Sequence, residues 1–371
     1  VEKREAIERA DADYQEAAVA LSQIVLGPVA GQLLRKRIVI VADGSLEYVP
    51  FGALPAPVIR ASASPDRTSE TSEKAKVKEL IESGGKPLIV DHEIVKLPSA
   101  SALAVLRREL AGRKVAPKLV AVLADPVFDK SDPRLGPTAG KEGDTAVPVS
   151  STDTAGDPVI SSPLISPSDD VPTENGKGPF PRLPFSRLEA KSILSSCPPG
   201  SFWRALDFDA NKAMATSPKL NQFRIVHFAT HGLLNNRHPE LSGLVFSLFD
   251  QKGDSQDGVL QLNEIYNLNL SADLVVLSAC QTALGKEIRR EGIVGLTSGF
   301  MYAGAARVMA SLWKVDDEAT ADLMQRFYYG VLRRGLTPAA ALRSAEVAMW
   351  KEGKWRSPFY WAGFVVYGEW Q

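Results

Sequence analysis

Short apolar runs alternate along this chain with segments whose apolar residues recur at helical spacing. The runs lie at residues 38–42, 118–126, 223–230, 273–279, 307–313 and 364–367. Bounded apolar runs of this length are typical of buried strands, and the segments between them are long enough to be crossover helices. The pattern therefore predicts an α/β fold with a largely parallel sheet.

The helical segments are predicted at residues 2–35, 99–110, 186–195, 291–302, 316–332 and 338–350. Ser99 is expected to cap the second of them, and Asp316 or Asp317 the fifth. In the fourth, Gly292, Gly295 and Gly299 indicate close packing on the sheet. Residues 46–50 are interpreted as a hairpin arm.

Two stretches break the alternation. Residues 55–74 are rich in Pro, Ser, Thr and Glu and are interpreted as an exposed loop. Residues 129–179 are rich in Pro, Ser, Thr, Asp and Gly, and we expect a disordered insertion there. We divide the chain into a helical segment 1–35, a first half 36–200 and a second half 201–371.

Composition excludes several classes of protein. A hydrophobic content of 44%, a charged content of 23% and a net charge of −1 are ordinary for a globular protein and give no basic field for nucleic acid. No apolar run is long enough to span a bilayer, so we expect no membrane partner. The opening Val1-Glu2-Lys3 indicates a fragment or processed form that begins inside a helix.

The two cysteines, Cys197 and Cys280, are too few for a disulfide framework, which favours a reducing cytoplasm. With four histidines and no tight His/Cys cluster, we expect no metal site and no cofactor.

The candidate chemistry lies at the ends of two predicted strands. One runs into His231-Gly232 and the other into Cys280-Gln281. If the strands are parallel neighbours, imidazole and thiol meet at the carboxyl edge of the sheet, where α/β proteins place their chemistry. A thiol is only a few per cent thiolate at neutral pH, and an imidazole beside it can take its proton. The backbone N–H groups of Gly232 and Cys280 are the predicted oxyanion donors.

Three other residues compete with this assignment. His227 lies four positions before His231, on the same strand face, but inside the apolar run, which favours a satisfied core histidine over a base. Cys197 precedes a Pro-Pro-Gly turn and is interpreted as an inert thiol. His238 lies in a polar loop and is expected to be solvated.

At these residues the sequence resembles the CHAT domains, the caspase-like domains associated with tetratricopeptide repeats, of the same peptidase clan as caspases and separase. His231 lies 49 positions before Cys280, close to the spacing of about 50 known for caspases. The matching segments are Val226–Gly232, Leu277–Thr282, Glu291–Leu296, Ala303–Arg307, Ser311–Asp317, Asp43–Leu46, Val49–Phe51, Leu97–Ser101 and Leu123–Pro126.

The resemblance implies a cysteine endopeptidase that uses His231 and Cys280, in a three-layer α/β/α sandwich whose first half is a non-catalytic caspase-like unit. It implies a protein substrate, and an upstream repeat domain or an activating protein as regulator. Asp316 and Asp317 follow the strand after the catalytic one, where caspase-like folds build the P1 pocket, and Trp313 is a candidate for the pocket wall. Helix capping explains one of the aspartates equally well, and Trp313 is equally interpretable as core. Glu287 and Glu291, near the loop after Cys280, are weaker pocket candidates.

Two alternatives stay open. The chain could be a non-catalytic scaffold that binds proteins, or a thiol acyl transferase of another kind. Nucleotide binding is disfavoured because no strand ends in a Gly-x-Gly-x-x-Gly or Gly-Lys-Ser/Thr loop.

Overall fold

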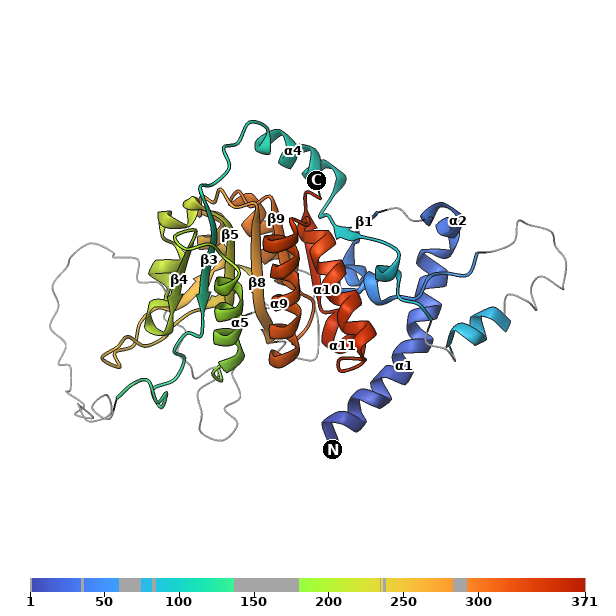
Figure 1. Cartoon of the computed structure of the whole chain (residues 1–371), viewed down its shortest axis with the longest axis horizontal. Helices are drawn as coiled ribbons and strands as arrows, with labels where there is room; N and C mark the ends of the chain where they lie inside the picture. The colour runs from blue at the N-terminus through green and yellow to red at the C-terminus, as the bar shows by residue number, and fades with distance from the viewer. Residues whose placement is uncertain are drawn as a thin grey trace, which may run out of the picture.

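The computed structural model of the chain describes residues 2–34, 37–59, 75–81, 85–136, 180–233, 235, 238–282 and 292–370. Its centre is one ten-stranded sheet (Figure 1). Eight of the strands follow the order β1-β2-β10-β9-β8-β5-β3-β4, and the other two extend the sheet from β5, where β6 pairs with β5 and β7 pairs with β6. The strands are β1 (Ile38–Ile40), β2 (Ile94–Lys96), β3 (Lys118–Ala124), β4 (Phe202–Leu206), β5 (Phe223–Leu233), β6 (Gly243–Val245), β7 (Val259–Gln261), β8 (Leu274–Thr282), β9 (Arg307–Ser311) and β10 (Phe364–Gly368).

Most neighbouring strands of the sheet run parallel, as the sequence predicts. Parallel pairs join β4, β3, β5, β8 and β9 in one block. At the other end β10 is antiparallel to β9 but parallel to β2, which in turn is parallel to β1. The strand β3, from the predicted first half, lies between β4 and β5 of the predicted second half, so one sheet spans both.

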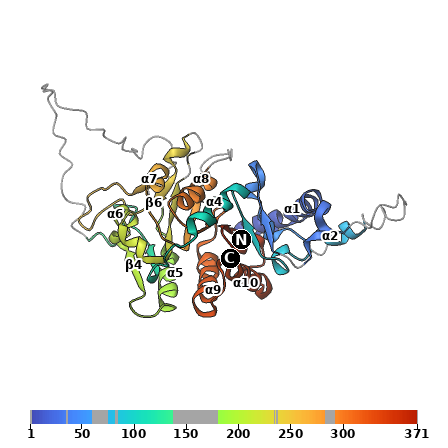
Figure 2. The same cartoon turned by 90° about the horizontal axis from the view of Figure 1, so that it is seen from above.

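Helices cover both faces of the sheet and complete the expected three layers (Figure 2). One face packs against α5, α9, α10 and α11, and the other against α7 and α8. The helices are α1 (Glu2–Val25), α2 (Ala30–Leu33), α4 (Ala100–Leu110), α5 (Pro184–Ser195), α6 (Lys212–Ala215), α7 (Leu262–Tyr266), α8 (Gly292–Tyr302), α9 (Asp317–Arg334), α10 (Pro338–Glu352) and α11 (Pro358–Trp361).

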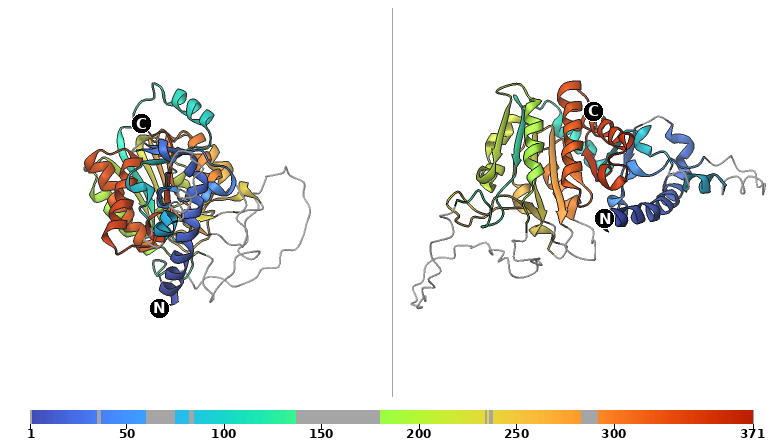
Figure 3. Two further views of the ribbon diagram at one scale, coloured as in Figure 1. Left: turned by 90° about the vertical axis from the view of Figure 1, so that its right-hand side faces the viewer. Right: turned by 60° about the horizontal axis from the view of Figure 1, so that its bottom comes forward.

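The helix α1 lies at the β1 end of the sheet (Figure 3). There Ala18 and Leu26 share a small core with Phe51, Leu54 and Leu88. Among the described residues no single helix is long and apolar enough to cross a bilayer. Two consecutive helical segments, Asp13–Val25 and Gly27–Leu33, reach the required length and apolar character only when they are taken together, and the chain bends by 51° between them.

Two local predictions are wrong. Residues 44–48 form a 3₁₀ helix rather than a hairpin arm, because the Lys96 ammonium donates to the carbonyls of Glu47 and Val49, where a partner strand would otherwise be needed. The described glycines of α8 also face a different partner, although the helix itself packs on the sheet. A Cβ at Gly299 would lie 2.9 Å from Leu262 Cδ1, so this glycine serves the contact with α7 and not with the sheet.

The predicted disordered insertion 129–179 is folded over residues 129–136. Arg134 there forms ion pairs with Asp125, Asp132 and Asp207, so long-range charge pairing orders a stretch that has few apolar residues. Residues 137–179, and residues 60–74 of the predicted exposed loop, lie outside the described residues.

Candidate active site

The two strands that carry the predicted reactive residues are parallel neighbours in the centre of the sheet. The Cα register of β5 and β8 pairs His227 with Val276, Ala229 with Ser278, and His231 with Cys280. Both strands end together, at Leu233 and Thr282. The backbone therefore places positions 231 and 280 side by side at the carboxyl edge of the sheet. Residues 283–291 after Cys280, with the pocket candidates Glu287 and Glu291, lie outside the described residues.

The imidazole of His231 is buried, with 3% of the residue exposed. Its Nε2 lies 2.7 Å from the carbonyl oxygen of Pro181. A carbonyl can only accept a hydrogen bond, so Nε2 carries the proton. Among the described residues, Nδ1 of His231 has no hydrogen-bond partner. The ring thus holds an unprotonated nitrogen with a free lone pair.

Aromatic side chains enclose this ring. The centroid of the His231 ring lies 4.8 Å from that of Phe128 and 5.5 Å from that of Phe180. Burial lowers the pKa of His231 to about 4. The hydrogen bond to Pro181 raises this pKa and so opposes the effect of burial, whereas the positive charge of nearby Lys314 lowers it further. The imidazole is therefore neutral near pH 7, as a general base must be.

The competing histidine, His227, has a polar group close to each ring nitrogen, although only its Nδ1 makes a hydrogen bond among the described residues. Its Nδ1 lies 2.9 Å from the Tyr328 hydroxyl on α9, and its Nε2 lies 3.0 Å from Glu189 Oε1 on α5. The other oxygen of Glu189 accepts a hydrogen bond of 3.1 Å from Ser278 of β8. We call Glu189, His227, Ser278 and Tyr328 the core polar cluster. His227 is thus a fully buried core histidine, with a hydrogen bond at Nδ1 and an ion-pair contact at Nε2 that lacks hydrogen-bond geometry.

Sequence reasoning missed Glu189. It lies in a segment with the ordinary polar composition of a surface helix, Ser186-Arg187-Leu188-Glu189, yet only 3% of it is exposed. Its carboxylate contacts both strands of the site, at His227 of β5 and Ser278 of β8. The available signal was the helical period, which places Glu189 on the same face as the buried Ala190 and Ile193.

The three predicted pocket residues have different surroundings. Asp316 caps α9, accepting a hydrogen bond from the Ala319 N–H, so the capping interpretation is confirmed. The indole of Trp313 donates to the carbonyl of Phe359 and packs beside Gly363. Asp317 is half-buried and accepts a hydrogen bond of 3.3 Å from the Phe185 N–H.

Asp317 lies among other carboxylates. Burial raises the pKa of Asp317 to about 6; the Phe185 N–H opposes this rise, and Glu189, Asp316 and Asp125 add to it. An acid whose negative charge is disfavoured by burial and by like charges is a favourable site for a cationic group.

The remaining candidates do not extend the site. His238 is exposed and contacts Glu240 at 3.2 Å. Cys197 is buried, and burial raises the pKa of its thiol to about 11, which makes it inert. In the part of the chain that the structure describes, no group of three His, Cys, Asp or Glu residues could hold a metal ion.

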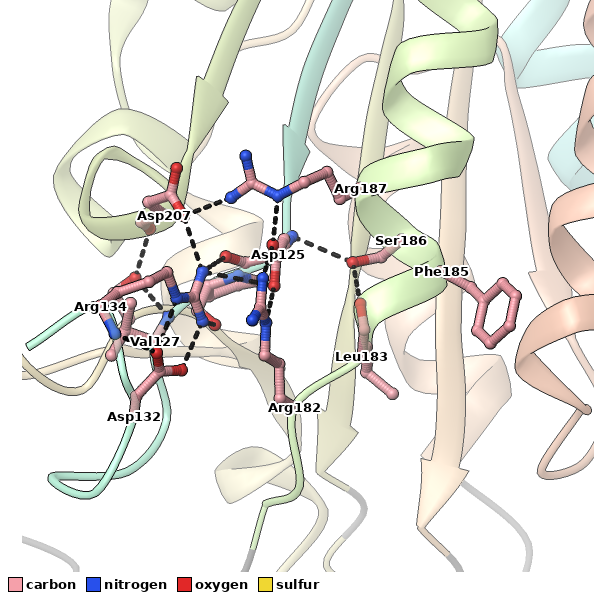
Figure 4. A network of polar contacts seen from close by, with 12 residues as sticks. Asp125, Val127, Asp132, Arg134, Arg182, Leu183, Phe185, Ser186, Arg187 and Asp207 are labelled. Atoms are coloured by element: carbon pink, nitrogen blue, oxygen red, sulfur yellow. Dashed lines mark hydrogen bonds and ion pairs between the residues drawn. The ribbon is translucent and has the colours of Figure 1, made fainter.

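A second polar cluster lies beside His231, and sequence reasoning did not identify it. Asp125 follows the last residue of β3 and is fully buried, and the guanidinium groups of Arg134, Arg182 and Arg187 converge on its carboxylate (Figure 4). Arg134 and Arg187 also reach Asp207 after β4. We call these residues, with Asp132, the Asp125 cluster. It contains three arginines and three aspartates and is formally neutral.

Residues 15–369 match the CHAT domain family. Over 110 residues the chain is 36% identical to Tetratricopeptide repeat protein 28 of Mus musculus, and over 113 residues 34% identical to that of Homo sapiens. Each match covers 30% of this chain and 4% of the relative, so the chain spans only a small part of these proteins.

Among solved structures, the chain is similar to one of the Saccharomyces cerevisiae separase–securin complex, with a TM-score of 0.44 at 12% identity, over 90% of this chain and 15% of that chain. It is also similar to the Arg-specific cysteine proteinase gingipain R, with a TM-score of 0.42 at 9% identity, over 76% and 55% of the two chains.

Proposed function

This chain belongs to the CHAT domain family, and from that premise we propose that it is a cysteine endopeptidase acting through Cys280 and His231. The observation that carries the proposal is the state of His231. Its Nε2 is committed to the Pro181 carbonyl, its Nδ1 has no partner among the described residues, and its register neighbour is Cys280. A neutral imidazole with one free lone pair beside a thiol is the arrangement that nucleophilic catalysis needs.

In the proposed reaction Nδ1 of His231 accepts the thiol proton as the sulfur of Cys280 attacks the scissile carbonyl carbon. The resulting imidazolium gives that proton to the leaving amine when the C–N bond breaks, and a thioester remains on Cys280. Water then attacks the thioester with His231 as base again, releasing the acid and the thiol. Each proton that His231 takes up it returns, so the cycle balances.

Gly232 and Cys280 are the proposed oxyanion donors. In the sheet Gly232 pairs in register with Leu244 of β6 and Gln281 of β8. Its backbone is thus held on both sides next to His231. A preorganised N–H donor is worth a factor of about 10² to 10³ in kcat when it lies at the position of the oxyanion.

We propose a basic P1 residue for the substrate, with Asp317 as its partner. Asp317 is the pocket candidate whose surroundings favour a cation, since burial and three neighbouring carboxylates all oppose its own ionisation. A lysine or arginine side chain would restore the ionised form by a charge-assisted hydrogen bond. Asp316 and Trp313 would then support the pocket from the α9 cap and from the contact with Phe359.

We further propose that tetratricopeptide helices or another protein partner regulate the site. The support for this is the sequence identity to Tetratricopeptide repeat protein 28.

Cleavage of a mixed peptide library by the wild type and by Cys280→Ala tests the proposal. We expect cleavage by the wild type, after Lys or Arg, and none by Cys280→Ala. Cleavage that survives Cys280→Ala would refute the dyad. A wild type that cleaves nothing, and whose Cys280 does not react with iodoacetamide, would favour the protein-binding scaffold.

The same library distinguishes the two aspartates. Asp317→Asn should lower kcat/KM for Arg-P1 peptides by roughly 10- to 100-fold, from the loss of a charged hydrogen bond, and leave Gln-P1 peptides unchanged. Asp316→Ala should keep the P1 preference while costing about 1 kcal/mol of stability through the lost cap. An unchanged Arg preference in Asp317→Asn would remove Asp317 from the pocket.

A further inference from the structure

The carboxylate of Asp125 binds three arginines, but they differ in their distance along the chain from Pro181, whose carbonyl contacts the proposed catalytic base. Arg182 forms a bidentate pair with it, from Nε to Oδ1 at 2.9 Å and from Nη2 to Oδ2 at 2.8 Å. Arg187 donates from Nε to Oδ2 at 2.6 Å, and Arg134 lies 3.3 Å from Oδ1. Figure 4 shows that the three side chains approach from different directions.

The backbone around Asp125 is as constrained as its side chain. Asp125 has a φ of 50°, in the left-handed region that Asp tolerates better than most residues. Its N–H donates to the Ser186 hydroxyl at 3.1 Å, and that hydroxyl donates to the carbonyl of Leu183 at 2.7 Å. Asp125 is therefore a fixed point at the end of β3, and it holds the segment from Arg182 to Ser186.

That segment begins directly after the groups that contact His231. The carbonyl of Pro181, the residue before Arg182, accepts the hydrogen bond from His231 Nε2. The ring of Phe180 packs against the imidazole at 5.5 Å. The carbonyl that fixes the proton on Nε2 of His231 therefore belongs to the peptide bond between Pro181 and Arg182.

We propose that Arg182 is a positioning residue, whose pair with Asp125 holds the Pro181 carbonyl in place and so keeps His231 in the tautomer with Nδ1 unprotonated. This inference rests on the proposed function of His231 as the base. If the carbonyl moves away, Nε2 loses its acceptor and the proton can reside on Nδ1. A ring protonated at Nδ1 cannot accept the thiol proton at that nitrogen. A misplacement of about 1 Å can cost roughly 10²-fold in rate.

Arg187 supplies a matched control. Its side chain is 38% exposed, as is that of Arg182, and both contact Oδ2 of Asp125. Arg187 lies within α5, six residues beyond Pro181, so its loss weakens the same charge cluster without loosening the carbonyl directly. A purely structural role for the cluster predicts similar effects for the two arginines.

The test compares wild type, Arg182→Met, Arg182→Lys and Arg187→Met, with denaturation curves to confirm that each is folded. The first readout is the ¹⁵N chemical shifts of the His231 ring, assigned by their loss in His231→Gln. We expect the Nε2–H tautomer in the wild type and in Arg187→Met, and a mixture of tautomers in Arg182→Met. Arg182→Lys, which keeps the charge but not the bidentate pair, should be intermediate. An unchanged tautomer in Arg182→Met would overturn the inference.

The second readout is peptide cleavage. Arg182→Met should lower kcat by roughly tenfold or more with little change in KM, and Arg187→Met by less than about threefold. Equal losses in the two variants would assign the cluster to stability alone. Because the tautomer is read without substrate, a protein that cleaves no peptide but shows the expected ¹⁵N shifts would refute the proposed function and leave the positioning by Arg182 standing.

Discussion

His227 and His231 lie four positions apart on one strand, are both buried and both contact residues from the α5 side of the sheet, yet their surroundings differ in one respect. Each ring nitrogen of His227 lies close to a polar side chain: Nδ1 is hydrogen-bonded to the Tyr328 hydroxyl, and Nε2 is at ion-pair distance from the Glu189 carboxylate without hydrogen-bond geometry. Among the described residues, His231 has a partner on Nε2 and none on Nδ1. The two rings are buried on the same strand face, and each makes one hydrogen bond among the described residues. The carboxylate beside the second nitrogen of His227 therefore separates a structural histidine from a candidate base.

The difference follows from position along β5. His227 lies in the middle of the strand, where α5 and α9 cross the sheet and bring Glu189 and Tyr328 over it. His231 lies near the end of the strand, before the first turn of α5, where the chain offers a carbonyl and two aromatic rings. Core packing thus places two polar side chains around one histidine, whereas the other lies at the strand end, in register with position 280.

The largest expected effect separates the two histidines by activity. His231→Gln should lower kcat/KM by about 10³-fold, because general base catalysis contributes roughly 10² to 10⁴. His227→Gln should reduce activity per folded molecule by less than about tenfold, while lowering stability. Steady-state kinetics with a cleaved library peptide, beside urea denaturation of both variants, measures this. Equal kinetic losses in the two variants would erase the distinction.

The second effect concerns the carboxylate that satisfies His227. Glu189→Ala leaves buried donors on His227 and Ser278 without an acceptor and should cost about 3–5 kcal/mol of unfolding free energy. Glu189→Gln keeps one acceptor and should cost less. Urea denaturation gives both values. If Glu189→Ala costs less than about 1 kcal/mol, the core polar cluster does not join β5 to β8.

The third effect uses pH. The pKa of His231 is about 4 in the folded chain, below the usual 6.5. At pH above 6.5 the ring is neutral in both states, so it adds no pH dependence. As pH falls from 6.5 to 4 the unfolded chain binds a proton that the folded chain does not, and stability falls by roughly 3 kcal/mol. This decline should be absent from His231→Gln in denaturation curves at several pH values. If the decline is the same in both proteins, other groups cause it.

The smallest expected effect tests the Tyr328 hydroxyl that contacts His227. Tyr328→Phe removes its hydrogen bond to His227 Nδ1 and should cost about 1 kcal/mol, with activity nearly unchanged. Burial and nearby Glu189 raise the pKa of Tyr328 well above its usual value, so the hydroxyl stays protonated. Loss of activity with unchanged stability would connect His227 to the chemistry.

The sequence predicts the largely parallel sheet well, because continuous apolar strands such as 223–230 and 273–279 carry a strong signal. That these two strands are neighbours is only a condition of the sequence-based prediction. Sequence-based prediction fails where long-range polar contacts decide the structure. Residues 129–136 are folded because Arg134 pairs with Asp125 and Asp207, which no local pattern reveals. Glu189 and Arg182 have the appearance of surface charges, since their partners lie on strands distant in the sequence. The polar cluster around each histidine could therefore be recognised only in three dimensions.

The central claim is that His231, and not His227, activates Cys280. The rate of iodoacetamide alkylation at Cys280 tests it most directly, followed by mass spectrometry near pH 6.5 in wild type, His231→Gln and His227→Gln. Cys197, whose burial raises its thiol pKa to about 11, is the unreactive reference in every sample. We predict fast alkylation of Cys280 in the wild type and in His227→Gln and slow alkylation in His231→Gln. Equal rates in the wild type and His231→Gln would contradict the account.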